Sequence, residues 1–128
     1  MYIFTLVTDV ERAIERLKQE GGDFTLAVLY NSSLESEWGW NLIVAARWLD
    51  RLGLAAATRL VAEALYKDVG LENKSAISRV TVLKTNDPFV REMTNLYPVA
   101  PGSRVPVQQL SAGELTGSGF ILYSRKAA

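Results

Sequence analysis

The feature that most constrains the fold of this chain is a short apolar segment, residues 24–30 (FTLAVLY). Its side chains alternate in the manner of a β-strand, and both of the resulting faces are mostly apolar. A strand that is apolar on both faces lies inside a sheet, with layers packed above and below it. The segment therefore predicts an interior strand of a layered sheet.

A second apolar segment, residues 40–48 (WNLIVAARW), fits two structures. A helix would align residues at three- and four-residue spacings on one face: Trp38, Leu42, Ala45 and Leu49. We favour a strand, because a Trp-Gly-Trp start followed by three bulky apolar residues suits a pleated surface better than a helix. The two segments then form a hairpin whose loop is residues 31–39.

Helical patterns flank this hairpin. Thr8 and Glu11 have the spacing of a capping box, which predicts a helix over residues 9–20 that ends at Gly21 and Gly22. Residues 2–7 are either a short strand or an added helical turn. After the hairpin, a helix is predicted from residue 50 or 54 to residue 69, with a stripe of buried side chains at three- and four-residue spacings: Leu54, Ala57, Val61, Ala64, Leu65 and Asp68.

The second half of the chain predicts two further strands and a helix. Residues 76–84 are rich in β-branched side chains, and a helix over residues 88–96 follows, with Asn86 or Asp87 as its cap. Residues 104–110 fit an edge strand, where Pro106 needs no hydrogen-bonded partner. Residues 111–114 are predicted as a short helical turn, and residues 120–125 as the last strand.

This order of elements predicts an α+β fold. The 128 residues fit a single domain, residues 1–128, in which helices pack against one mixed sheet of four to five strands. Hydrophobic residues make up 48% of the chain, enough for an ordinary globular core.

The charge and the missing residue types exclude several functions. Fourteen basic and fourteen acidic residues cancel, so nothing favours binding to nucleic acid or to a membrane. The absence of cysteine excludes thiol chemistry and disulfides, and the absence of histidine excludes histidine bases and most catalytic zinc sites. No segment resembles a membrane span or a secretory signal, so we expect a cytoplasmic protein.

Residues 10–93 resemble the minimal nucleotidyltransferase-like domains of the DNA polymerase β superfamily, which in bacteria occur as antitoxins paired with helical proteins. The stretches that carry the resemblance are VERAIERLKQEGGDFTLAVLYNSS, WGWNLIVAA, AISRVTVLK and NDPFVREM, with the late GFILYSR as a further match. In that family a helix leads to a strand that ends in Gly-Ser. A strand with Asp-x-Asp, a helix and a strand with a third aspartate follow.

The motifs of this family are replaced here by other residues. Asn31-Ser32 stands in place of Gly-Ser, Gly39-Trp40-Asn41 in place of Asp-x-Asp, and Ser78 or Arg79 in place of the third aspartate. Neutral side chains cannot hold the two magnesium ions that the family uses. The resemblance therefore implies a degenerate, inactive member.

Polar side chains follow two predicted strands and form a candidate ligand site. If those strands are parallel neighbours, both sets of side chains open at one edge of the sheet, where open sheets bind ligands. The residues concerned are Asn31, Ser32, Glu35, Glu37, Lys84, Asn86 and Asp87. Glu35, Glu37 and Asp87 could bind a cation, and Lys84 or Arg79 an anion. The alternative is that Ser32 and Asn86 or Asp87 only cap helices.

Trp38 and Trp40 are candidate interaction residues, because an aromatic ring beside a polar loop either stacks on a ligand or meets a protein partner. Two hypotheses follow. The first is a non-catalytic interaction or regulatory domain of a bacterial cytoplasmic protein, with a protein partner or self-association as a homodimer. The second is a metal-dependent nucleotide-binding enzyme or small-molecule-binding protein with its carboxylates at the strand ends. The cofactor is unknown, and neither catalytic nor metal-binding residues are assigned.

Overall fold

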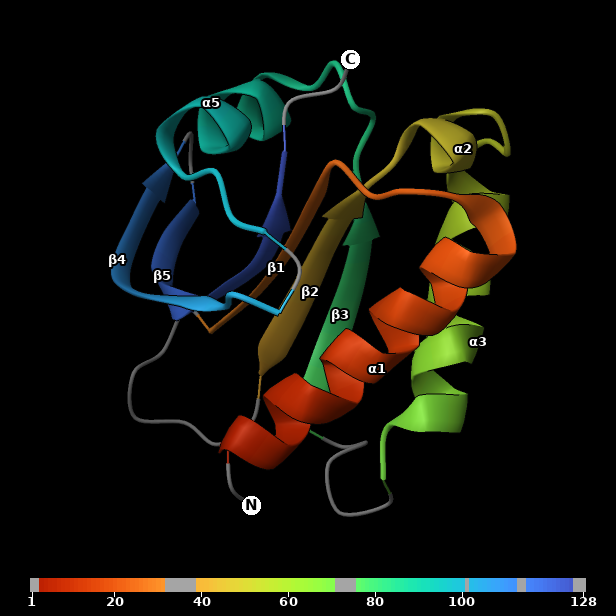
Figure 1. Cartoon of the computed structure of the whole chain (residues 1–128), viewed down its shortest axis with the longest axis horizontal. Helices are drawn as coiled ribbons and strands as arrows, with labels where there is room; N and C mark the ends of the chain where they lie inside the picture. The colour runs from red at the N-terminus through yellow and green to blue at the C-terminus, as the bar shows by residue number, and fades with distance from the viewer. Residues whose placement is uncertain (1–2, 32–38, 71–75, 101, 113–114, 126–128) are drawn as a thin grey trace.

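The computed structural model of the protein describes residues 3–31, 39–70, 76–100, 102–112 and 115–125. It contains helices and a five-stranded mixed sheet, which confirms the predicted α+β fold (Figure 1). In chain order the elements are α1 (Ile3–Gly21), β1 (Leu26–Asn31), β2 (Trp40–Ala45), α2 (Arg47–Asp50), α3 (Leu54–Asp68), β3 (Ile77–Val82), α5 (Pro88–Leu96), β4 (Val105–Ala112) and β5 (Leu115–Ser124).

The strand β1 lies in the middle of the sheet, whose order is β3-β2-β1-β5-β4. It pairs antiparallel with β2 on one side and with β5 on the other. The β1–β2 register runs from Leu26 opposite Ala45 to Asn31 opposite Trp40, so the predicted hairpin is confirmed. Every residue of β1 except Tyr30 is buried, as its two apolar faces predicted.

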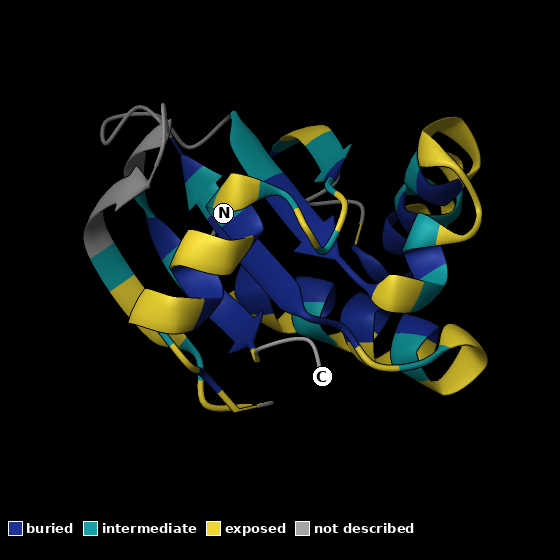
Figure 2. Cartoon of the chain, turned by 90° about the horizontal axis from the view of Figure 1, so that it is seen from above, coloured by how far each residue is buried: buried dark blue, intermediate teal, exposed yellow. Residues whose placement is uncertain are grey.

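Helices cover both faces of the sheet (Figure 1). Side chains of α1 and α3 form the larger core with one face, to which β1 contributes Ala27 and Leu29. Leu26 and Val28 point to the opposite face and pack with Val90 and Met93 of α5. Seen from above, buried residues lie in the middle of the sheet and on the inward sides of the helices (Figure 2).

The helix α1 begins at Ile3, so the added helical turn, and not the short strand, is the alternative found for residues 3–7, and Thr8 is not the helix cap. Thr8 is an exposed position within the helix, whereas Leu6 and Val7 are fully buried against the sheet. These apolar side chains continue the helical spacing of Val10, and their burial extends the helix through the capping sequence.

The segment after β1 divides into a strand and a short helix. Residues 40–45 form β2, as favoured from the sequence, and the chain then turns into α2. In α3 the predicted buried side chains Ala57, Val61, Ala64, Leu65 and Asp68 are buried. The prediction that Leu54 is buried is wrong, because this side chain is 64% exposed in the first turn of α3.

The last two strands form a long antiparallel hairpin at the other end of the sheet. Pro106 lies in the edge strand β4, as expected for a residue without an N–H group. The helical turn predicted for residues 111–114 is wrong where it is described, since Ser111 and Ala112 pair with β5. Pairing with Thr116 and Leu115 gives partners to the backbone N–H and C=O groups of Ser111 and Ala112, so the strand forms in place of the helical turn.

Candidate functional site

The structure separates the two halves of the ligand site expected from the sequence. That site required β1 and β3 to be parallel neighbours, but β2 lies between them, antiparallel to β1 and parallel to β3. Asn31 is therefore at one end of the sheet, and the segment that carries Lys84 and Asn86 is at the other end. Ser32, Glu35, Glu37 and Trp38 lie outside the described residues.

The carboxylates near the end of β3 have structural partners. Asp87 is the N-cap of α5, and its side chain accepts a hydrogen bond of 2.9 Å from the backbone N–H of Phe89. Asp50 accepts hydrogen bonds from the N–H (3.2 Å) and the hydroxyl (2.7 Å) of Thr85 rather than pairing with Arg47. Within the described ranges, no three metal-ligating side chains come together.

The positions matched to the nucleotidyltransferase motifs gather at the opposite end of the sheet. Asn31 pairs with Trp40 on β2, and Asn41 pairs with Arg79 on β3. Trp40 packs against the larger core, and the amide of Asn41 donates to the carbonyl of Gly39 (3.4 Å). The positions matched to the motifs are adjacent in the sheet, but their side chains include no carboxylate. This set of residues therefore cannot bind two magnesium ions.

The exposed backbone of the sheet is found at β3. This strand is the end member of the sheet, and its only neighbour among the described strands is β2. Its outer edge therefore presents unpaired N–H and C=O groups, which can pair with the backbone of another chain. Arg79 and Ser78 are exposed on this strand.

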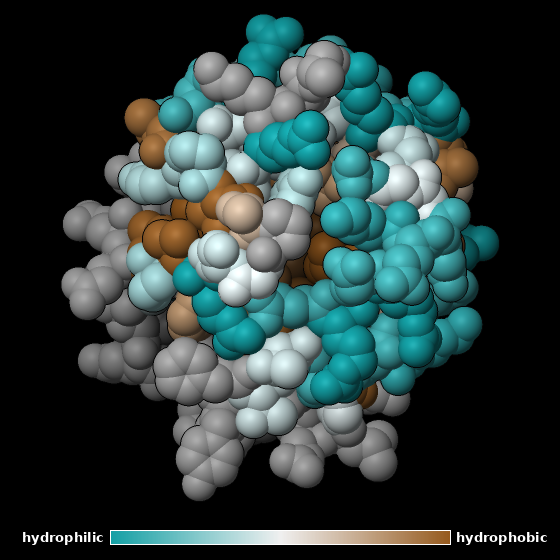
Figure 3. All heavy atoms as spheres, in the orientation of Figure 1, coloured by the Kyte–Doolittle hydropathy of each residue, from teal (hydrophilic) through white to brown (hydrophobic). Residues whose placement is uncertain are grey.

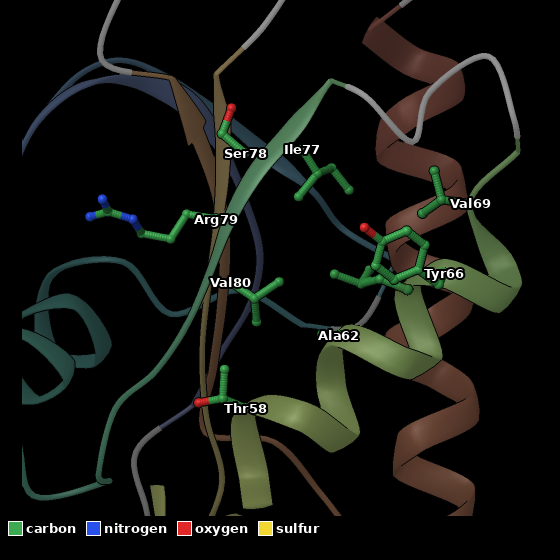
Figure 4. Close-up of a pocket in the computed structure, with 9 residues that line it drawn as sticks. Thr58, Ala62, Tyr66, Val69, Ile77, Ser78, Arg79 and Val80 are labelled. Atoms are coloured by element: carbon green, nitrogen blue, oxygen red, sulfur yellow. The ribbon is translucent and has the colours of Figure 1, made fainter. Parts of the chain in front are cut away.

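A cavity of about 250 Å³ lies along β3, between the strand and the neighbouring α3. Apolar side chains from both elements form its walls, and in Figure 4 Ile77 and Val80 of β3 point toward Ala62 and Tyr66 of α3. Arg79 points to the other side of the strand, away from the cavity. The groove beside the unpaired edge is therefore mainly apolar.

One side of α3 extends this apolar groove. Side chains at four-residue spacing lie on the same side of a helix, and four such positions run along α3: Leu54, Thr58, Ala62 and Tyr66. Leu54 and Tyr66 at the two ends are 64% and 66% exposed, and smaller residues lie between them. The Thr58 hydroxyl donates to the carbonyl of Leu54 (2.8 Å), which satisfies its proton within the helix.

We call these four residues, together with the outer edge of β3, the β3–α3 surface. It offers backbone hydrogen-bonding groups beside exposed apolar side chains, the combination through which an extended strand is added to a sheet. Its residues include no carboxylate, lysine or cysteine that could act as a base or nucleophile. The surface therefore offers backbone groups and apolar side chains to an added protein chain.

The residue spacing that marks this surface is present in the sequence, but it was not recognised because Leu54 was assigned to the predicted buried stripe of α3. Leu54 fits two helical series. One has three- and four-residue spacings and passes through the buried Ala57 and Val61, and the other has four-residue spacing and reaches Tyr66. Only the packing of α3 against α1 and the sheet shows which series is exposed.

A further hollow lies between α1 and the segment before β4, with a volume of about 370 Å³. Figure 3 shows hydrophilic residues over α1 and hydrophobic ones within the hollow. Glu11 of α1 and Arg104 form an ion pair across it. This ion pair joins the edge hairpin to α1, which is a structural role.

No family model matches the chain, and no curated protein or solved structure is significantly similar to it. The described helices include none that is both long and apolar enough to span a membrane. The likeness to the nucleotidyltransferase superfamily therefore stays a prediction. The fold and the surface define an α+β protein with an open sheet edge.

Proposed function

We propose that the protein is a non-catalytic interaction domain of a bacterial cytoplasmic protein, and that it binds a second copy of itself through the β3–α3 surface. The observation that carries the proposal is the outer edge of β3, which is unpaired among the described strands and lies beside Tyr66, on a side of α3 that begins with the exposed Leu54. An edge strand flanked by exposed apolar side chains is a site where proteins associate.

The arrangement of residues along α3 favours a second copy as the partner. In a two-fold symmetric pair the two α3 helices run antiparallel, with the axis at the level of Leu60. Thr58 then lies opposite Ala62 of the second copy, and Leu54 lies opposite Tyr66 of the second copy. Small residues at the centre allow close approach, and large apolar residues meet at both ends.

Charge is also complementary in this arrangement. Arg59 and Glu63 are exposed beside the apolar stripe, and neither forms an ion pair within the described part of the chain. In antiparallel helices Arg59 of each copy comes close to Glu63 of the other. The same symmetry brings the two β3 edges together, so that the two sheets join into one and the unpaired backbone groups gain partners.

An Ala62→Arg variant tests this proposal. The substitution places a charge at the centre of the interface, and we expect the dissociation constant of the dimer to rise at least about 30-fold, equivalent to about 2 kcal/mol. Sedimentation equilibrium should give a mass near twice 14.2 kDa for the wild-type chain and near 14.2 kDa for the variant.

Ala56→Arg is the matched control, because Ala56 is exposed on the same helix but does not line the groove. It should leave the dimer intact, and circular dichroism should show that both variants are folded. A wild-type chain that is monomeric at about 0.2 mM would refute self-association. Its dimer would have a dissociation constant well above that concentration, too weak for a specific interface. Equal effects of the two variants would assign the interface to another surface.

A further inference from the structure

A further cavity lies at the end of the sheet where the parallel strands β2 and β3 end. Its volume is about 350 Å³, within the range of small-molecule sites. The residues that line it come from four separate parts of the chain: Thr25, Arg47, Thr85, Asn86, Arg91, Thr94 and Asn95. The carboxyl ends of parallel strands are where open sheets bind ligands.

The lining is polar and positively charged. Two arginines line the cavity, Arg47 after β2 and Arg91 on α5, and no aspartate or glutamate does. Neither arginine forms an ion pair with a carboxylate in the described parts of the chain. Two arginines that line one cavity give it a positive charge, and an oxyanion bound there would neutralise this charge and accept their hydrogen bonds.

Two carboxylates near the cavity, Asp50 and Asp87, form hydrogen bonds in its walls. Asp50 accepts two hydrogen bonds from Thr85, and Asp87 caps the first turn of α5. Both carboxylates therefore hold the walls of the cavity in position.

The backbone at the cavity is also fixed by hydrogen bonds. Thr25 donates its N–H to the carbonyl of Ala45 (2.8 Å), and its carbonyl accepts from the N–H of Arg125 (2.9 Å). Thr25 is buried, with 6% of its surface exposed, so its position is set by the ends of three strands. The Asn86 and Asn95 side chains are exposed at the cavity and provide both donors and acceptors.

We propose that this cavity binds a small phosphate monoester with a hydroxylated body. Arg47 and Arg91 bind the phosphate oxygens, because the guanidinium group matches the oxyanion with paired N–H donors. Asn86, Asn95 and Thr25 hydrogen-bond to the hydroxyl groups of the body. The site is independent of the β3–α3 surface and would stand if the chain were monomeric.

The test is a titration of ¹⁵N-labelled protein with glycerol 3-phosphate, inorganic phosphate and glycerol, followed by amide chemical shifts. We expect saturable shifts at Thr25, Thr85 and Asn86 with glycerol 3-phosphate, weaker binding of inorganic phosphate, and none with glycerol. Arg47→Gln and Arg91→Gln should each weaken binding at least tenfold, because each removes a charged hydrogen-bond donor.

Arg51→Gln is the control, since Arg51 is equally exposed, lies four residues from Arg47 and does not line the cavity. It should bind the phosphate ester within about twofold of the wild type, because solvent and salt screen an exposed charge that makes no contact. The proposal is overturned if no probe gives saturable shifts at these amides. It is also overturned if Arg51→Gln weakens binding as much as the two cavity variants do.

Discussion

At Gly119 of β5 the backbones of two strands lie closer together than a side chain would allow. A Cβ atom built there would overlap the carbonyl oxygen of Leu29 and lie 2.6 Å from the Cα of Tyr30. Both neighbours are backbone atoms of the central strand β1, so they cannot rotate away as a side chain could. Glycine at this position is therefore a requirement of the β1–β5 pairing.

We expect Gly119→Ala to destabilise the protein by about 2–3 kcal/mol, because an added methyl group must push β5 away from β1. Urea unfolding followed by circular dichroism measures the change. Gly70→Ala is the control: among the described residues, the nearest atom to its Cβ would be a carboxylate oxygen of Asp9 at 3.6 Å, and the change should stay within about 0.5 kcal/mol. Similar losses in the two variants would contradict the role given to Gly119.

At the scale of the element, α5 depends on its cap. Asp87 accepts from the N–H of Phe89, Pro88 occupies the first turn, and only the inward side of the nine-residue helix is buried. We expect Asp87→Ala to lower the free energy of unfolding by about 1 kcal/mol. Asp23→Ala is the comparison, because Asp23 is exposed and its ion pair with Lys18 spans 3.7 Å; its effect should be below about 0.5 kcal/mol. A cap variant as stable as the wild type would disprove the capping role.

The elements that could be predicted from the sequence are those whose signals are local. The cap predicted at Asn86 or Asp87 and the alternation in residues 24–30 act over a few residues; both are confirmed, with Asp87 as the cap. The start of α1 and the course of β4 are set by contacts with distant parts of the sheet, so local capping patterns failed there. Strand direction is also non-local, and for that reason the ligand site built on parallel strands was not found.

The same distinction applies to the two candidate sites. Asn86 was expected at a ligand site from its position after a strand, and it lines the cationic cavity. Arg47 and Arg91 were missed because they lie 44 positions apart in the sequence, and only the sheet topology brings them to one cavity. The ligand-binding role expected for Glu35 and Glu37 stays a prediction.

At the scale of the whole molecule, the sheet divides the core into two unequal parts. The part on the side of α1 and α3 contains most of the large, fully buried side chains, including Leu6, Leu17 and Leu49. The part under α5 is smaller and relies on Val90, Met93 and their contacts with the sheet. A short helix that buries little apolar surface opens at a lower free energy than the rest of the protein.

We therefore expect the amides of α5 to exchange with solvent through a local opening that costs less than global unfolding. Native-state hydrogen exchange at increasing denaturant measures the opening free energy of each amide. Met93→Ala, which removes a fully buried side chain, should lower the opening free energy of α5 amides by about 2–5 kcal/mol and leave the order of opening unchanged. Leu17→Ala, at an equally buried position, should instead lower the values for α1 and β1. If the slowest amides of α5 and β1 open at the same free energy in the wild type, the two parts of the core unfold together. The expected local opening of α5 would then be contradicted.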